Sequence, residues 1–182
     1  QWGCKQTQGI AVRAKQVFEE NGLPTLILDG DGATMTNKGS QTVSDGGTSI
    51  AINGDNARVT NDGAQTITSG GTGTEITGND AIVDNTGQMT VSDAGSIAMN
   101  IDGDNALVLN EGDQTISGGG TGTKISGDNA TLSSTGDISV DGSGSAVVIL
   151  DGNDARMTQT GDLVVTNGAW GLLSHGENNT LS

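Results

Sequence analysis

A glycine-led turn recurs along this chain at intervals of 24 or 25 residues. The glycines that begin the turn are Gly30, Gly54, Gly78, Gly103, Gly127, Gly152 and Gly176. A second glycine follows nine residues after each of the first six, at Gly39, Gly63, Gly87, Gly112, Gly136 and Gly161. A fixed period of this length is typical of repeat proteins, in which each unit buries its apolar face against the next. The repeat therefore predicts a solenoid rather than a globular fold.

Each repeat contains three short stretches of alternating apolar and polar residues, which predict three strands with one buried face each. Like residues recur at like positions. Two residues before the glycine that begins each turn, the column is Leu28, Ile52, Ile76, Ile101, Ile125 and Leu150. Three residues after that glycine, the column is Ala33, Ala57, Ala81, Ala106, Ala130 and Ala155. In the third stretch, the column is Val43, Ile67, Val91, Ile116, Val140 and Val165. These columns predict an all-β, parallel β-solenoid of six coils and a partial seventh over residues 25–182, with 24–25 residues and three strands per coil.

The composition agrees with a narrow interior. The chain has 31 glycines but only Trp2, Phe18 and Trp170 as aromatic residues, and the alanine column suits a core lined by small and branched aliphatic side chains. Both single-residue insertions fall in one turn, between Val91 and Met99 and between Val140 and Val148. A column of Gln41, Gln65 and Gln114 leaves two possibilities open, namely stacked side-chain amides inside the core or a place at a corner.

The first 24 residues have a different pattern. Ile10, Ala14, Val17 and Phe18 recur at helical spacing, which predicts an amphipathic α-helix from Gly9 to Glu20. Asn21 and Gly22 would end it before Pro24. We therefore expect residues 1–24 to form a helical cap over the open end of the solenoid, a role that repeat proteins require.

Several classes of protein are disfavoured. Cys4 is the single cysteine, so neither an internal disulfide nor a site of several thiolates can form. A formal net charge of −15 disfavours binding to nucleic acid. The longest apolar run, Ala146 to Leu150, is too short to cross a bilayer, so no membrane insertion is expected. The sequence lacks a starting Met and a signal-like segment, which suggests a fragment or a processed form.

From about residue 25 to the end, the chain resembles the passenger domains of bacterial autotransporters and related surface adhesins. The resemblance lies in the turn from Gly54 to Ala57, its copy from Gly103 to Ala106, and the strings from Gly70 to Thr74 and from Gly119 to Thr123. It implies a right-handed parallel β-helix, located at a bacterial cell surface or outside the cell.

Residues 1–31 separately resemble a segment of 2-hydroxyacyl-CoA dehydratase subunits, through Trp2 to Gln6, the expected helix, and Gly22 to Asp31. That family implies an iron–sulfur ligand at Cys4. An iron–sulfur cluster normally takes four thiolates, so we expect no cofactor here. The two resemblances meet at Leu26 to Asp31, which suggests a chimera, engineered or recombined.

Carboxylates recur at the turn that follows the first strand, and Asp102, Asp104 and Asp128 are its calcium candidates. Asp and Asn also favour turns, because their side chains bond the local backbone, and the EF-hand pattern is missing. We therefore expect no metal. We also expect no catalytic residues, because coils of such even length provide no loops to enclose a substrate and His175 is the single histidine. A row of Thr42, Thr66, Thr68, Thr90 and Thr115 suggests ice binding, but it breaks at Ser139, Asp141 and Val164.

The sequence thus predicts a non-enzymatic, structural and adhesive rod from an autotransporter-like surface protein. Its expected partners are a host or surface receptor and, through the open C-terminal coil, a second copy in end-to-end association. The alternative is an engineered or chimeric solenoid scaffold without a ligand. Ice-binding and calcium-binding solenoids are further alternatives.

Overall fold

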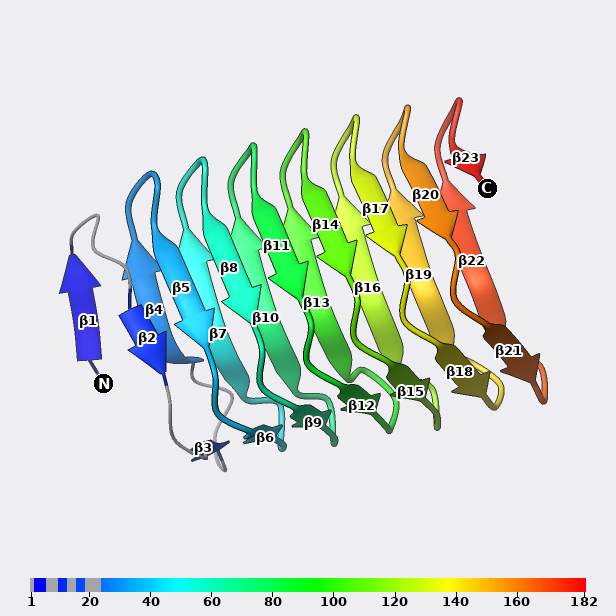
Figure 1. Ribbon diagram of the computed structural model, residues 1–182, viewed down its shortest axis with the longest axis horizontal. Helices are drawn as coiled ribbons and strands as arrows, with labels where there is room; N and C mark the ends of the chain where they lie inside the picture. Colours follow the sequence, from blue (N-terminus) through cyan, green and yellow to red (C-terminus); the bar gives the residue numbers. More distant parts are fainter. Residues whose placement is uncertain (1, 6–9, 13–15, 19–23) are drawn as a thin grey trace.

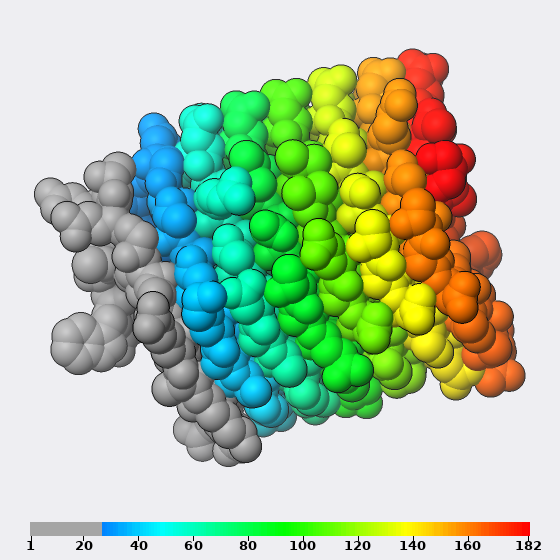
Figure 2. Space-filling model, viewed as in Figure 1, coloured from blue at the N-terminus to red at the C-terminus, as the bar shows by residue number. Residues whose placement is uncertain are grey.

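The protein is an all-β parallel solenoid with three strands in each full turn (Figure 1). The computed structural model describes residues 2–5, 10–12, 16–18 and 24–182, with side chains from residue 27 onward. Its first and last strands lie at opposite ends of the stack, and the coils after residue 26 form parallel slanting bands on the face that Figure 2 shows. Three sheets, which we name A, B and C, run along the stack.

Sheet A contains the first strand of each coil. Its eight strands, in spatial order, are β1 (Trp2–Lys5), β4 (Pro24–Asp29), β7 (Thr48–Asn53), β10 (Thr72–Thr77), β13 (Ile97–Asp102), β16 (Thr121–Ser126), β19 (Ala146–Asp151) and β22 (Trp170–His175).

Sheet B contains the second strand of each coil. Its eight strands are β2 (Ile10–Val12), β5 (Thr34–Asn37), β8 (Arg58–Asn61), β11 (Ile82–Asn85), β14 (Leu107–Asn110), β17 (Thr131–Ser134), β20 (Arg156–Gln159) and β23 (Thr180–Leu181).

Sheet C contains the third strand of each full coil. Its seven strands are β3 (Gln16–Phe18), β6 (Gln41–Val43), β9 (Gln65–Ile67), β12 (Met89–Val91), β15 (Gln114–Ile116), β18 (Ile138–Asp141) and β21 (Leu163–Thr166).

The strand register confirms the columns that the repeat predicts. Each strand pairs in parallel with the strand one coil away, so Ile52 lies opposite Ile76 in sheet A and Ile67 lies opposite Val91 in sheet C. Inward side chains of the middle coils are almost fully buried, and the alanine column from Ala33 to Ala155 is buried in every coil. The core is therefore a continuous column of aliphatic side chains between the three sheets.

The helix predicted from Gly9 to Glu20 is wrong for the residues that the structure describes there. Residues 10–12 form β2 and residues 16–18 form β3, and the described part of the chain contains no helix. Gln16 pairs with Gln41 and Phe18 with Val43, so this segment follows the same register as the later coils. A helix would have left the outer edges of β5 and β6 without backbone partners, whereas β2 and β3 supply them. That residues 1–24 act as a cap stays a prediction.

The two inserted residues lie, as predicted, in the turn between sheets C and A. In both longer turns a buried serine bonds back to the preceding coil: the Ser96 hydroxyl accepts a hydrogen bond from Gly70 N at 3.0 Å, and the Ser145 hydroxyl accepts one from Gly119 N at 3.0 Å. The extra residue is therefore accommodated with a hydrogen bond between coils.

Candidate functional site

The turn between sheets A and B, which we name the AB corner, carries a ladder of side-chain oxygens. At each step, Oδ1 of one Asp or Asn accepts a hydrogen bond of 2.8–3.1 Å from the backbone N–H at the same position in the next coil. The acceptors are Asp31, Asp55, Asn79, Asp104, Asp128 and Asn153. Because each acceptor satisfies a backbone donor of its neighbour, this column ties six successive coil junctions together.

The next residue of the AB corner adopts a left-handed backbone conformation. Asn56, Asp80, Asn105, Asn129 and Asp154 have φ values between 55° and 60°. Asn and Asp tolerate this region better than other residues with a side chain. Turn geometry and the oxygen ladder together account for the recurrence of Asp and Asn at this corner.

The three calcium candidates lie at this corner. Asp104 and Asp128 are both members of the ladder. Asp102 ends β13, and its partners in the adjacent coils are Thr77 and Ser126, so no carboxylate stacks directly on it. Among the described residues, no group of three or more His, Cys, Asp or Glu side chains is arranged to hold a metal ion.

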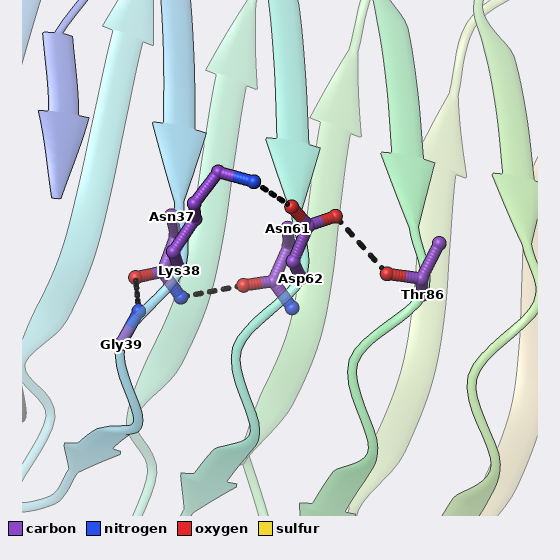
Figure 3. Close-up of polar contacts among 6 residues, drawn as sticks. All are labelled: Asn37, Lys38, Gly39, Asn61, Asp62 and Thr86. Atoms are coloured by element: carbon purple, nitrogen blue, oxygen red, sulfur yellow. Dashed lines mark hydrogen bonds and ion pairs between the residues drawn. The ribbon is translucent and has the colours of Figure 1, made fainter. Parts of the chain in front are cut away.

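The turn between sheets B and C, which we name the BC corner, contains a buried amide ladder that we did not predict. The Asn37 amide donates to Asn61 Oδ1 at 2.5 Å, Asn61 to Asn85 at 2.6 Å, and Asn85 to Asn110 at 2.7 Å (Figure 3 shows the first step). The ladder continues from Asn110 Nδ2 to the Ser134 hydroxyl at 3.2 Å. The signal was present in the sequence, because Asn stands two residues before Gly39, Gly63, Gly87 and Gly112.

Glycines pack directly beside this amide ladder. A Cβ atom on Gly87 would lie 2.1 Å from the carbonyl oxygen of Gly63 and 3.0 Å from Asn61 Nδ2. The Asn85 amide also donates to Gly87 O at 2.8 Å. The glycine column thus lets successive coils approach closely while the amides bridge them.

The glutamine column lies inside the core, which decides the alternative that the sequence left open. Gln65 Nε2 donates to Gln41 Oε1 at 2.7 Å, and both residues are buried. The stack stops at Met89, which occupies the column between Gln65 and Gln114. Buried Gln114 Oε1 has no hydrogen-bond partner among the described residues, because the next residue of the column, Ile138, has no amide to donate to it.

The outward face of sheet C carries the threonine row. Thr42, Thr66, Thr90 and Thr115 lie opposite one another, followed by Ser139 and Val164. Thr68 lies outside this row, just past the end of β9. Towards the C-terminus, a shallow depression of about 330 Å³ is lined by the last three residues of this row, Thr115, Ser139 and Val164, and by Asp113, Asp137 and Asp162. There the Asp113 and Asp137 carboxylates accept hydrogen bonds from backbone N–H groups of the next coil, at 3.0 and 2.9 Å.

His175, the residue of greatest interest for acid–base chemistry, lies at the exposed end of β22. Its Nδ1 atom is 2.6 Å from Asp151 Oδ1, while Lys124 Nζ is 3.7 Å from Asp151 Oδ2. The His175 side chain is 61% exposed. This group is an open surface cluster and has no enclosing walls in which a substrate could be desolvated.

Two carboxylates have a lowered pKa. A hydrogen bond from Lys38 Nζ, 2.7 Å long, and a second from Thr86 Oγ1, 3.1 Å long, lower the pKa of Asp62 (Figure 3). Hydrogen bonds from Thr166 and Asn167, both 2.6 Å long, lower the pKa of Asp141. Each donor stabilises the charged carboxylate. Both carboxylates bond to a neighbouring coil, so they belong to the same set of inter-coil contacts as the ladders.

Cys4 lies in β1, opposite Leu28 of β4. The prediction about Cys4 as an iron–sulfur ligand concerns its side chain, which lies outside the part of the structure that is described. No helix among the described residues has the length and apolar character needed to cross a membrane.

Comparison with known proteins gives no further identification. No family model, no curated protein and no solved structure matches this chain.

Proposed function

We propose that this chain is a non-enzymatic structural and adhesive rod, with the right-handed parallel β-helix of autotransporter-like passengers. The observation that carries this proposal is the pair of ladders at the AB and BC corners. Both run from coil to coil through side chains that bond across the coil boundary. Such bonds add to the backbone ladders of three sheets and oppose bending of the stack.

The outward surface also favours a rod over an enzyme. The described coils differ in length by one residue, and the titratable groups with lowered pKa face neighbouring coils. An extended, even surface of this kind suits contact with a large partner, such as a receptor on a host or on another surface. We place the protein at a bacterial cell surface or outside the cell, where a stiff acidic rod would hold a binding surface away from the membrane.

Surface display tests the proposal. Bacteria that display the full chain should adhere to host-cell monolayers in greater numbers than the same bacteria without it. A matched variant lacks residues 79–127, a length of two coils, and joins Gly78 directly to Asp128. This deletion keeps the repeat in phase and should shorten the rod by about 10 Å, at about 4.8 Å per coil, which small-angle X-ray scattering can measure.

The shortened chain should adhere less well than the full chain if adhesion depends on the length of the rod. Equal adhesion with and without the full chain would contradict the adhesive role and would favour the alternative, a solenoid scaffold without a ligand.

A further inference from the structure

The strands of sheet B carry a charge opposite to that of the chain as a whole. They contain two bases, Arg58 and Arg156, and one acid, Asp84. The strands of sheet A contain four acids and two bases, and those of sheet C contain one acid and no base. The chain has a net charge of −15, so among the described strands sheet B alone gives a face with net positive charge.

Arg156 presents an unpaired positive charge on this face. Its side chain is exposed, and its guanidinium group has no hydrogen-bond or ion-pair partner among the described residues. Its register neighbours in the two adjacent coils are both present, and they are Thr131 of β17 and Thr180 of β23 rather than acids. Asp154, two residues earlier, accepts a hydrogen bond of 3.1 Å from Asn178. By contrast, the other bases with described side chains each have a carboxylate within 4.0 Å, in the pairs Lys38–Asp62, Arg58–Asp84 and Lys124–Asp151.

Hydroxyl groups lie beside Arg156 on the same face. Thr131 lies directly opposite it in β17, and Ser133 and Thr158 form the adjacent pair of the same two strands. All three side chains are partly exposed. A guanidinium group offers a fork of donors that fits a carboxylate, and a hydroxyl group can donate one further hydrogen bond. This part of sheet B therefore suits a carboxylate supplied by a partner.

Between the two arginines, the outward face of sheet B is apolar. Ile82 of β11 lies opposite Leu107 of β14, and Leu109 extends this patch along β14, in the middle of the row of strands in Figure 1. These three side chains are partly exposed, whereas the alternate residues Val83 and Val108 are 1% and 0% exposed. Contact with apolar side chains of a partner would remove the patch from water, which is favourable.

The size of this face fits one segment of a partner chain. Arg58 and Arg156 are four coil steps apart, which is about 19 Å at about 4.8 Å per coil. The strands are four residues long, or about 13 Å at about 3.3 Å per residue. The face thus measures about 250 Å², whereas a stable interface buries about 800 Å² on each partner. A second copy of this chain would therefore find too little area here.

We propose that the outward face of sheet B binds an acidic segment of another protein, in which apolar side chains separate two carboxylates. Arg156 binds one carboxylate, and Arg58, whose contact with Asp84 is 4.0 Å long, binds the other. Ile82 and Leu107 contact the apolar side chains between them. In an extended segment, carboxylates about six residues apart span the distance between the arginines, at about 3.3 Å per residue. A segment of this kind that approaches sheet A or sheet C meets net negative charge instead.

A synthetic polypeptide tests the chemistry of the partner. The probe is fluorescently labelled poly(Glu,Tyr), a random copolymer of acidic and aromatic residues. Poly(Glu), which lacks apolar groups, and heparin, an acidic polysaccharide, are the controls. Fluorescence anisotropy with the purified full chain at physiological salt should show binding to poly(Glu,Tyr) and much weaker binding to both controls. Absence of binding to the copolymer, or equal binding to all three polymers, would overturn the proposal.

The inference rests on the proposed function in that it assigns the surface through which the rod contacts a receptor. The two proposals fail separately, because the polymer assay uses purified protein and the adhesion assay uses cells. Adhesion without binding to the copolymer would overturn only the assignment of sheet B. Binding to the copolymer without adhesion would contradict only the adhesive role.

A charge-reversal pair locates the carboxylate contact. Arg156→Glu should weaken binding of the copolymer about tenfold, as expected for the loss of a hydrogen bond between charged groups. Lys124→Glu makes the same change of charge on sheet A and should have little effect. Equal losses for the two variants would show that only the net charge of the rod matters, and would overturn the proposal.

A second pair of variants locates the apolar contact. The double variant Leu107→Thr with Leu109→Ser gives β14 the outward residues that β17 has at Thr131 and Ser133, so the fold should persist, as circular dichroism can verify. Its binding of the copolymer should fall to the level of poly(Glu). Ile149→Thr, at a partly exposed position of sheet A, is the control and should bind as wild type does. Unchanged binding by the double variant would overturn the role of the apolar patch.

Discussion

The side-chain amide of Asn61 donates a hydrogen bond of 2.6 Å to Oδ1 of Asn85, its counterpart in the next coil, inside the closed interior of the solenoid. The two residues are 3% and 0% exposed. Asn85 in turn donates to Asn110 at 2.7 Å and to Gly87 O at 2.8 Å. Asn85 therefore acts as donor and acceptor at once, and its removal affects both neighbouring coils.

Asn85→Ala should lower the free energy of unfolding by about 3 kcal/mol, because it removes the acceptor of one Asn61 amide hydrogen and the donor to Asn110 Oδ1 inside the core. Asn85→Ser should cost less, because a hydroxyl already serves as the acceptor at Ser134. Urea titration followed by circular dichroism measures both effects. Thr90→Ala, an outward change on sheet C, is the control and should stay within about 0.5 kcal/mol of wild type. Equal stability of Asn85→Ala and wild type would contradict the role of the ladder.

Gly87→Ala should destabilise the protein by well over about 3 kcal/mol or prevent folding, because overpacking against fixed backbone cannot relax by side-chain motion. Its Cβ would lie 2.1 Å from Gly63 O. Gly46→Ala is the matched control, because Gly46 has φ of 71° but a Cβ added there would meet no atom within 4 Å. It should cost only about 1–2 kcal/mol, the strain of a left-handed residue. Thermal unfolding of both variants makes the comparison, and a loss for Gly87→Ala no larger than that for Gly46→Ala would contradict the need for a close approach between coils at this glycine column.

Asp104→Asn should leave stability nearly unchanged, because Asn79 already performs the same task in the AB ladder through its Oδ1 atom. Asp104→Ala removes the acceptor for Asp128 N and should cost about 1 kcal/mol. Chemical denaturation distinguishes the two variants. A loss for Asp104→Asn as large as that for Asp104→Ala would show that the charge, rather than the oxygen position, matters here.

Addition of calcium tests whether the carboxylates of the AB corner bind a metal ion. We expect millimolar calcium and magnesium to raise the melting temperature equally, by screening the repulsion among the carboxylates. A selective effect of calcium, abolished in Asp104→Asn, would instead establish a calcium site.

Asp62 should titrate below its ordinary pKa of 3.8. The folded-state value is depressed, so the stabilisation is present above the unfolded-state pKa and is lost as pH falls through the folded-state pKa. Lys38→Met should return the pKa of Asp62 towards 3.8, because it removes the largest cause of the shift. The side chains of the pair are 50% and 32% exposed, so the loss of stability near neutral pH should be only about 0.5 kcal/mol.

Carbon-detected NMR titration of the carboxyl groups measures this pKa. Asp141 is the internal control, because its lowered pKa comes from Thr166 and Asn167 and should not respond to Lys38→Met. An unchanged Asp62 pKa in Lys38→Met would contradict the assignment of its cause.

Cys4→Ser should leave the purified protein unchanged in fold and in metal content. With one thiol per chain, a cluster that normally takes four thiolates would need several chains. Anaerobic purification followed by iron analysis checks this expectation. Stoichiometric iron in wild type that disappears in Cys4→Ser would support the ligand role that the resemblance to the dehydratase family implies.

Much of this fold could be predicted from the sequence, because every coil carries the same pattern of inward and outward residues. One correct assignment of Ile52 and Ala57 to inward positions fixes the same assignment in every coil. The insertion turn was likewise visible from the spacing of Val91 and Met99. The N-terminal segment has no such support, because the repeat glycines begin at Gly30. The helical spacing of its apolar residues therefore predicted a helix where the chain forms strands.

The sequence by itself determined the period, the three strands per coil and the aliphatic columns, because these depend on residues that recur at fixed intervals. The tertiary structure decided what depends on contacts between coils. It placed residues 10–12 and 16–18 in strands, since β5 and β6 offer backbone partners that no local pattern reveals. It also decided that Asn61 and Asn85 form a ladder while Gln114 Oε1 remains unsatisfied. A buried amide is stabilised or destabilised by the atom opposite it, and that atom lies a full coil away along the chain.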